Sequence, residues 1–177
     1  MTRLGADPYR TVLADFNRSG VRYVVVGMSG INYYATGPDT AFATLDYDLF
    51  VEPTVRNVTQ AVRRLKALGL TVGTAEGALD AAALPAVVRD RRTLTATTPD
   101  GLMIELLLAV SGYPFAELAR DAVTFTVQGT PVAVGQLTKL LKSKKLANRP
   151  KDRQFLRRYE AQLREHIPPR PRKSARR

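Results

Sequence analysis

The chain of 177 residues contains no cysteine, no tryptophan and a single histidine, His166. Without cysteine it can form neither disulfide bonds nor thiolate metal sites, and one histidine cannot build a Cys/His zinc centre. No apolar run approaches the roughly 20 residues that span a membrane, and residues 1–8 lack the apolar core of a signal peptide. These absences favour a cytoplasmic protein with no membrane contact.

Acidic residues are scarce at the C-terminal end. The net charge is +11, and 15 of the 27 Lys and Arg residues lie in Lys139–Arg177, beside only three acidic residues. We expect one domain over residues 1–167 and a basic, disordered tail over 168–177, which is too rich in Pro and Arg to enter a core. A solubilising role would explain the tail, but a basic helix continuous with it favours contact with a nucleic acid backbone.

The pattern of apolar residues predicts a single α/β unit. Helical spacing and end signals occur in four segments, and alternation or β-branched runs occur in six. The expected helices cover residues 9–17, 54–68, 135–147 and 150–166, and the expected strands cover 21–26, 45–51, 93–98, 102–108, 123–127 and 131–134. Residues 73–84, which are rich in Gly and Ala, show no clear pattern beyond a short helix over 78–83.

Two carboxylates, Asp46 and Asp48, bracket Tyr47 on the apolar strand over 45–51. Strand alternation places both on the same face of the sheet. Because two like charges held this close repel each other, the pair favours a hard divalent cation such as Mg²⁺, which binds carboxylate and phosphate oxygens together. Solvated surface is the alternative explanation for an isolated Asp-x-Asp pair.

A short Gly/Ser segment, Gly27-Met28-Ser29-Gly30, follows the strand over 21–26 and precedes a helix that can start at Ile31. Such a turn lets backbone N–H groups approach phosphate oxygens, with the Ser29 hydroxyl as a further donor. The segment has neither a Walker A lysine nor a complete dinucleotide fingerprint, so a purely structural turn is the alternative.

A third carboxylate, Glu105, is the only charge on the strand over 102–108, which Pro99-Asp100-Gly101 joins to the preceding strand as a hairpin. An ionised carboxylate is rarely buried without a partner, because its desolvation is costly. Two interpretations remain open for Glu105: it belongs to the site of Asp46 and Asp48, or it forms a salt bridge with an arginine.

Taken together, these features resemble the nucleotidyltransferase fold of the polymerase beta superfamily: a strand ending in a Gly/Ser turn, then Thr44-x-Asp46-x-Asp48, then one carboxylate on a later strand. The segment Lys144–Asp152 is similar to the helical Lys, Arg and Asp segment of minimal nucleotidyltransferases related to abortive-infection (AbiEii-type) toxins. The resemblance covers about residues 20 to 160. It implies a mixed, twisted sheet flanked by helices, with a C-terminal helical segment.

The resemblance also implies roles for the acidic residues. Asp46 and Asp48 would bind two Mg²⁺ or Mn²⁺ ions, one with the triphosphate of an NTP and one at the acceptor hydroxyl. Glu105 would complete the second metal site or take the proton of the acceptor, although Asp is commoner than Glu at this position in the family.

Phosphate binding would fall to the Gly/Ser turn and the basic segment. Backbone amides near Gly27, Ser29 and Gly30 would hold the leaving phosphates, with Lys144 offsetting their charge and Arg149 nearby. Arg149 and Asp152 would mainly hold each other or position Lys144, for which a solvated basic face is the alternative. In the family Gly-Gly or Gly-Ser is usual where this chain has Gly27-Met28-Ser29.

The implied reaction transfers a nucleoside monophosphate from an NTP to a hydroxyl and releases pyrophosphate. The leading acceptor is RNA, in particular the 3′ end of tRNA, bound through the basic C-terminal region, in a toxin that has a cognate antitoxin protein. Related minimal enzymes instead attach AMP to a partner protein, often as the antitoxin. The alternative without enzymatic activity is a degenerate, basic nucleic-acid-binding module.

Overall fold

The computed structural model describes residues 7–35 and 46–165. The helices are α1 (Pro8–Ser19), α2 (Gly27–Asn32), α3 (Val55–Ala67), the short 3₁₀ helix η1 (Ala81–Ala83), α4 (Leu84–Arg89), α5 (Phe115–Arg120), α6 (Leu137–Ala147) and α7 (Pro150–Arg164). The strands are β1 (Tyr23–Val25), β2 (Asp46–Val51), β3 (Thr71–Thr74), β4 (Gly77–Ala78), β5 (Leu94–Thr97), β6 (Met103–Leu107), β7 (Val123–Val127) and β8 (Thr130–Val134). No helix in these ranges is long and apolar enough to cross a membrane.

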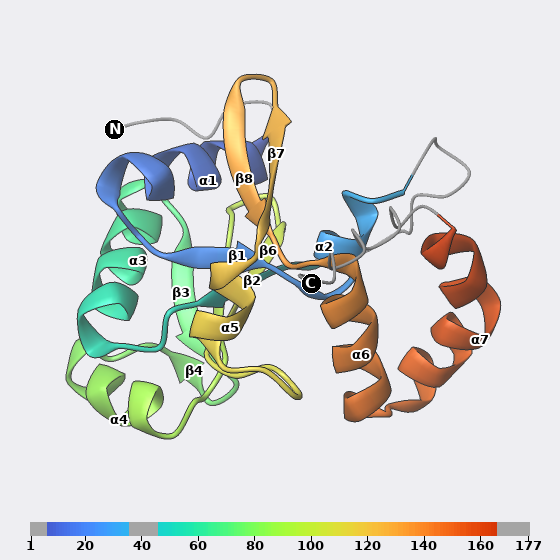
Figure 1. Ribbon diagram of the computed structural model, residues 1–177. Helices are drawn as coiled ribbons and strands as arrows, with labels where there is room; N and C mark the ends of the chain where they lie inside the picture. The colour runs from blue at the N-terminus through green and yellow to red at the C-terminus, as the bar shows by residue number, and fades with distance from the viewer. Residues whose placement is uncertain (1–6, 36–45, 166–177) are drawn as a thin grey trace, which may run out of the picture.

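The described strands form a single mixed sheet in the order β4-β3-β5-β6-β2-β1-β8-β7 (Figure 1). The centre of this sheet combines both kinds of pairing, since β2 is antiparallel to β1 and parallel to β6, while β1 is parallel to β8. The expected mixed α/β architecture is therefore confirmed. The predicted hairpins β5–β6 and β7–β8 are also present, each with antiparallel pairing.

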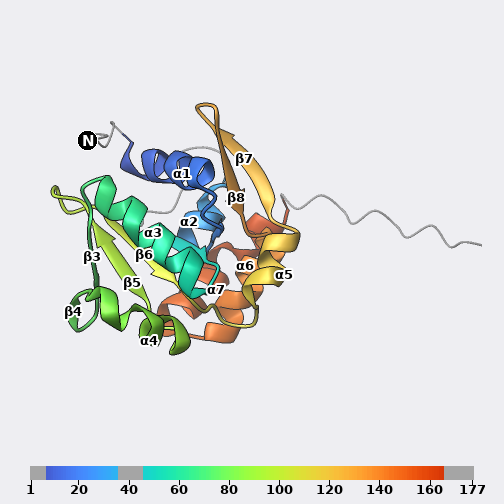
Figure 2. The same cartoon turned by 90° about the vertical axis from the view of Figure 1, so that its left-hand side faces the viewer.

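Helices cover both faces of the sheet. In Figure 2, α1 and α3 lie in front of the sheet and α6 and α7 lie behind it. The α3 helix begins after Thr54, whose hydroxyl accepts a hydrogen bond from the Asn57 amide, and it buries Val58, Val62 and Leu65 on one side. This spacing of three and four residues is the helical period that the sequence shows. The helices and the sheet together enclose an apolar core that includes Leu49 and other buried residues of the central strands.

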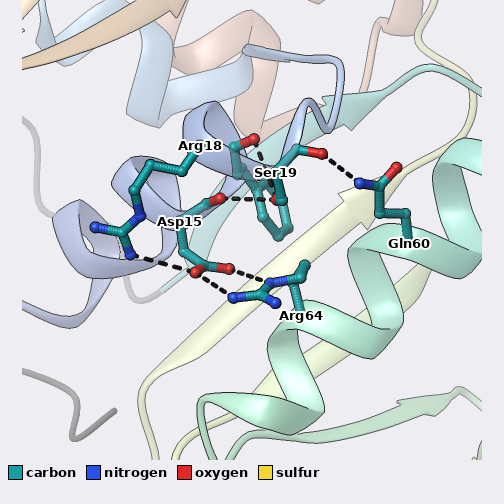
Figure 3. A network of polar contacts seen from close by, with 6 residues as sticks. Asp15, Arg18, Ser19, Gln60 and Arg64 are labelled. Atoms are coloured by element: carbon teal, nitrogen blue, oxygen red, sulfur yellow. Dashed lines mark hydrogen bonds and ion pairs between the residues drawn. The ribbon is translucent and has the colours of Figure 1, made fainter.

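An ion pair between a buried carboxylate and a partly exposed arginine joins the two helices on the front face (Figure 3). The Asp15 side chain on α1 accepts hydrogen bonds from Nε and a terminal nitrogen of Arg64 on α3, each at 2.7 Å. Arg18 approaches the same carboxylate at 3.3 Å. These hydrogen bonds outweigh the cost of burial and lower the pKa of Asp15. In a second link between the helices, Gln60 donates a hydrogen bond to the Ser19 carbonyl oxygen.

We expect Asp15→Asn to lower the free energy of unfolding by about 1 kcal/mol at neutral pH, because a buried carboxylate loses its charge-assisted hydrogen bonds from arginines that solvent partly screens. The pKa of Asp15 is lowered in the folded state, so its contribution is present above the unfolded pKa and is lost as the pH falls through the folded value. Urea denaturation of both proteins across the acidic range measures this. Curves that stay parallel down to low pH would contradict the prediction.

Some elements were not expected from the sequence. Strands β3 and β4 and the helices α4 and α5 are absent from the prediction, and the helix expected over 78–83 is only the 3₁₀ turn η1 leading into α4. The strand expected over 21–26 is shorter, at Tyr23–Val25. Thr44, His166 and the expected tail over 168–177 lie outside the described residues.

Candidate active site

A cleft of about 570 Å³ opens between the sheet and the C-terminal helices. Its floor is formed by β2, β6 and the start of α2, and its other walls by the loop after β6, by α6 and by the start of α7. Each residue that the sequence singled out for catalysis lines this cleft, apart from Ser29 and Gly30. The set comprises Gly27, Asp46, Asp48, Glu105, Lys144 and Arg149.

Asp48 and Glu105 lie side by side because of the parallel register between β2 and β6. Asp48 is the direct partner of Glu105 in that register, so the two side chains lie next to each other on one face of the sheet. Burial is the largest cause that raises the pKa of Asp48, to about 7, and the negative charge of Glu105 is the next. Asp46 adds to the effect, whereas Lys144 opposes it. The salt bridge to an arginine that was the alternative for Glu105 is not formed among the described residues.

Asp46 lies on the same face of β2, as the alternation predicted, and also lines the cleft. Tyr47, between the two aspartates, points to the opposite face and stacks on Tyr9 of α1 with ring centroids 4.6 Å apart. Within residues 7–35 and 46–165, however, no group of three or more Asp, Glu, His or Cys side chains is arranged to hold a metal ion. The structure thus provides a close carboxylate pair, with Asp46 beside it, rather than the three-carboxylate centre that was expected.

This donor set fits a hard divalent cation. Mg²⁺ is commonly bound by one or two carboxylates together with substrate phosphates, rather than by a cage built entirely from protein side chains. Asp48 and Glu105 supply only oxygen atoms, and burial together with the charge of Glu105 raises the pKa of Asp48, so a cation would bind in competition with a proton. A Mg²⁺ or Mn²⁺ ion held there would neutralise phosphate charge and polarise an oxygen nucleophile.

Gly27 allows the carboxylate of Asp48 to lie over the start of α2. A Cβ atom at Gly27 would stand 2.2 Å from Oδ2 of Asp48, and the φ angle of Gly27 is +61°, in the left-handed region. Any other residue would therefore be strained and would displace the carboxylate. The sequence predicted a turn over residues 27–30 followed by a helix, but helix α2 already begins at Gly27.

Ser29 and Gly30 differ from the expectation in what they bond. The Ser29 hydroxyl donates to the Asp46 carbonyl oxygen and accepts from the Asp48 amide, both at 3.1 Å, so its hydrogen is directed to β2. The Gly30 amide donates to the Val26 carbonyl oxygen at 2.8 Å. A Cβ at Gly30 would lie 2.9 Å from Leu140 on α6, so this glycine allows close helix packing. Ser29 and Gly30 therefore do not line the cleft and instead hold α2 against β2 and α6.

We expect Ser29→Ala to lower the free energy of unfolding by about 1 to 3 kcal/mol, because the amide of Asp48 and the carbonyl of Asp46 lose their bridging partner. Thermal and urea denaturation measure the loss. Ser111→Ala is the control, because Ser111 is an exposed residue of the same cleft and its loss should leave stability unchanged within about 0.5 kcal/mol. Equal stabilities of the two variants would contradict the bridging role.

Lys144 is held in place by Asp152. Its Nζ atom lies 3.1 Å from Oδ1 of Asp152 and 5.3 Å from the centre of the Phe155 ring, and its side chain is only 11% exposed. Arg149 donates to the other oxygen of Asp152 at 2.6 Å. The expected pairing of Arg149, Asp152 and Lys144 is therefore present, and the solvated basic face that was the alternative for Lys144 is wrong.

Two further lysines line the cleft and had no assigned role. Lys139 contacts Asp121 at 2.8 Å and Glu117 at 3.5 Å, so it anchors α5 to α6. Lys151, in the first turn of α7, is exposed, and no ion pair links it to a carboxylate within the described parts of the chain. Lys151 is thus a cation of the cleft that is available to an incoming anion. Four of the eight residues from 144 to 151 are basic, so the sequence alone does not show which of them is paired and which is available to a ligand.

Comparison with solved structures identifies the fold. The structure matches the crystal structure of an antigenic nucleotidyltransferase-like protein from Paracoccidioides brasiliensis, with a TM-score of 0.55 and 16% sequence identity. The match covers 95% of this chain and 81% of that chain. No protein-family profile matches the chain, and no curated protein sequence matches it either. At this identity the likeness concerns the fold, which is nucleotidyltransferase-like.

Proposed function

We propose that the protein is a nucleotidyltransferase that moves a nucleoside monophosphate from an NTP to a hydroxyl acceptor with the help of Mg²⁺ or Mn²⁺. The observation that carries this proposal is the pairing of Asp48 with Glu105 at the floor of a cleft whose opposite wall holds Lys144. A nucleotidyltransferase-like fold supports it independently. Carboxylates and a lysine thus line the same cleft.

Each wall of the cleft has a distinct chemical task in this reaction. Asp48 and Glu105 would hold the cation, with Asp46 next to them on the same face. Lys144, kept in position by Asp152, would bind phosphate oxygens and offset their charge. An ionised carboxylate in the pair would also accept the proton of the attacking hydroxyl, whose oxygen then forms the new bond to the α-phosphorus as pyrophosphate leaves.

The first turn of α2 adds backbone donors at the same end of the cleft. Gly27 and Met28 line the cleft, and the first N–H groups of any helix have no carbonyl one turn back to bond. We assign phosphate contacts to these two amides. Ser29 and Gly30 would act indirectly, by fixing β2 and α6 against this turn.

The acceptor we propose is RNA, with the 3′ end of tRNA as the leading candidate, and the biological role is that of a toxin neutralised by a cognate antitoxin. The resemblance of Lys144–Asp152 to minimal nucleotidyltransferase toxins supports this role, as does the positive charge of the C-terminal part of the chain. In this role, induced synthesis of the protein arrests cell growth, and synthesis of the Glu105→Gln variant does not.

Transfer of label tests the reaction. The purified protein is incubated with Mg²⁺ and each NTP in turn, radiolabelled at the α-phosphate, together with bulk tRNA or total cell protein. Label in tRNA that disappears with EDTA and with Glu105→Gln supports the proposal. Label in protein would move the acceptor to a polypeptide. Absence of label from both, together with no Mg²⁺-dependent binding of NTP, would overturn the enzymatic proposal.

A further inference from the structure

The outer side of α7 carries a broad row of cations, in which Lys151 and Arg158 lie along one line of the helix and Arg153 and Arg157 along another. Lys151, Arg153, Arg157 and Arg158 are all exposed, and in the described residues no ion pair joins them to a carboxylate. Arg153 donates to the Asn148 carbonyl oxygen at 2.6 Å, and the Arg158 guanidinium lies 5.3 Å from the centre of the Tyr159 ring. Apart from these local contacts, the four charges face solvent.

The acidic residues of α7 do not neutralise this row. Asp152 is buried and faces Lys144, and Glu160 is paired with Lys145 and Arg164, each at 2.7 Å. Like charges one turn apart, such as Arg153 and Arg157, destabilise an isolated helix. A polyanion lying along the row would remove this repulsion, so the helix face is electrostatically complementary to a chain of phosphates.

The row leads into the cleft. Lys151 lines the cleft at the start of α7, and Arg158 lies two helical turns further along the same side of the helix, about 10 Å away along its axis. Figure 1 shows α7 at the edge of the molecule, beyond α6 and away from α3. A strand bound to this edge would have one end at the carboxylates and the remainder outside.

We propose that the outer face of α7 binds the phosphodiester backbone of a single-stranded RNA end, with Lys151 guiding the terminal hydroxyl toward Asp48 and Glu105. This inference rests on the proposed function, because it gives the acceptor of that reaction a path. A lipid surface fits less well, since the exposed large apolar residues of the described chain, Val55, Val123 and Leu146, all lie outside α7.

A binding measurement without NTP tests the surface separately from catalysis. The probe is a short fluorescein-labelled single-stranded RNA of mixed sequence, titrated by anisotropy over a range of KCl concentrations. The variant Arg157→Gln/Arg158→Gln removes two charges from α7. The matched control, Arg63→Gln/Lys66→Gln, removes two exposed charges from α3, on the other side of the molecule.

We expect the α7 variant to bind about tenfold more weakly at moderate salt, with a slope of log K against log salt that is shallower by about 1.4, as two lost contacts to single-stranded phosphates predict. The α3 control should change affinity less than about twofold. Equal losses in both variants, or no loss in either, would overturn the inference. Equal affinity for a polyglutamate peptide would also overturn it, because the surface would then bind acidic protein.

The thermal stability of both variants and their transfer activity separate the possible failures. Loss of Arg157 relieves its repulsion with Arg153 one turn away, whereas loss of Arg158 removes its contact with the Tyr159 ring, so we expect little net change in stability. A melting temperature within a few degrees of that of the natural protein shows that weaker binding does not come from unfolding. If RNA binding depends on α7 while no label is ever transferred, the reaction is wrong and the RNA surface is right. If label is transferred to RNA equally well by the α7 variant, the path is wrong and the reaction is right.

Discussion

Replacing Asp48 by asparagine should abolish nucleotidyl transfer and at the same time make the unliganded protein more stable. Asparagine keeps the shape of the side chain but cannot carry the charge that a divalent cation needs, so we expect a loss of at least about a thousandfold in rate, equivalent to about 4 kcal/mol. The gain in stability follows from the pKa of Asp48, which burial and the charge of Glu105 raise to about 7.

The sign of this gain depends on pH. Because the folded pKa of Asp48 is above the unfolded one, the folded state binds the proton more tightly, and stability declines as the pH rises from about 4 to about 7. Asparagine removes that decline. At mildly alkaline pH, and without divalent ions, we expect Asp48→Asn to raise the free energy of unfolding by about 2 kcal/mol.

Urea denaturation with and without Mg²⁺ measures both halves of this prediction. Asp90→Asn is the matched control, because Asp90 is an exposed carboxylate whose ion pair is with its neighbour Arg89. Mg²⁺ should stabilise the natural protein and the control but not the Asp48 variant, since a ligand that binds only the folded state raises its stability. An Asp48 variant that keeps full activity would remove the carboxylate pair from the mechanism.

Asp152→Asn is the second change with a large expected effect. The carboxylate is 1% exposed and serves two cations, Lys144 and Arg149, so its neutralisation leaves the poorly exposed Lys144 without its charged partner. Burial raises the pKa of Asp152, but the hydrogen bonds from Arg149 and Lys144 lower it by more, so the net effect is a lowered pKa and the group is ionised at neutral pH. We expect a loss of about 3 kcal/mol in stability and a loss of about one hundredfold in transfer rate.

Glu160→Gln on the same helix is the control for this change. Glu160 also binds two cations, Lys145 and Arg164, but these are about half exposed, so we expect a loss below about 1 kcal/mol and normal activity. Assays well below the melting temperature separate the two effects. Because Asp152 acts by positioning Lys144, its loss should change kcat more than KM for the acceptor. A drop in stability without any change in kcat would make Asp152 purely structural.

The sequence predicted those parts of the fold that rest on local patterns. Alternation identified β2, the turn signal Pro99-Asp100-Gly101 identified β6 as the second strand of a hairpin, and the spacing of apolar residues identified α3. The segments that were missed are short or poor in apolar residues: β3 contains two threonines and a glycine in four residues, and α5 has a single helical turn of buried contacts. Their structure depends on neighbours that a local pattern does not contain.

In the candidate site, too, local patterns predicted some features, and others depend on residues that are distant in the sequence. Alternation placed Asp46 and Asp48 on one face, but the pairing of Asp48 with Glu105 depends on the register of two strands that are distant in the sequence. The role of Ser29 was also beyond prediction, because a hydroxyl in a Gly/Ser segment can face a phosphate or a backbone amide with equal ease. Only the packing of α2 on β2 decides between these two roles.

The parallel pairing of β1 with β8 determines when the sheet and the cleft can be completed during synthesis of the protein. The antiparallel pair of β1 and β2 can form while most of the chain is still unmade, but β8, the partner on the other side of β1, is among the last strands to leave the ribosome. Helix α6, which forms the basic wall of the cleft, follows β8 immediately. A nascent chain therefore contains Asp48 and Glu105 before Lys144 has been made, so the cleft gains its basic wall only near the end of synthesis.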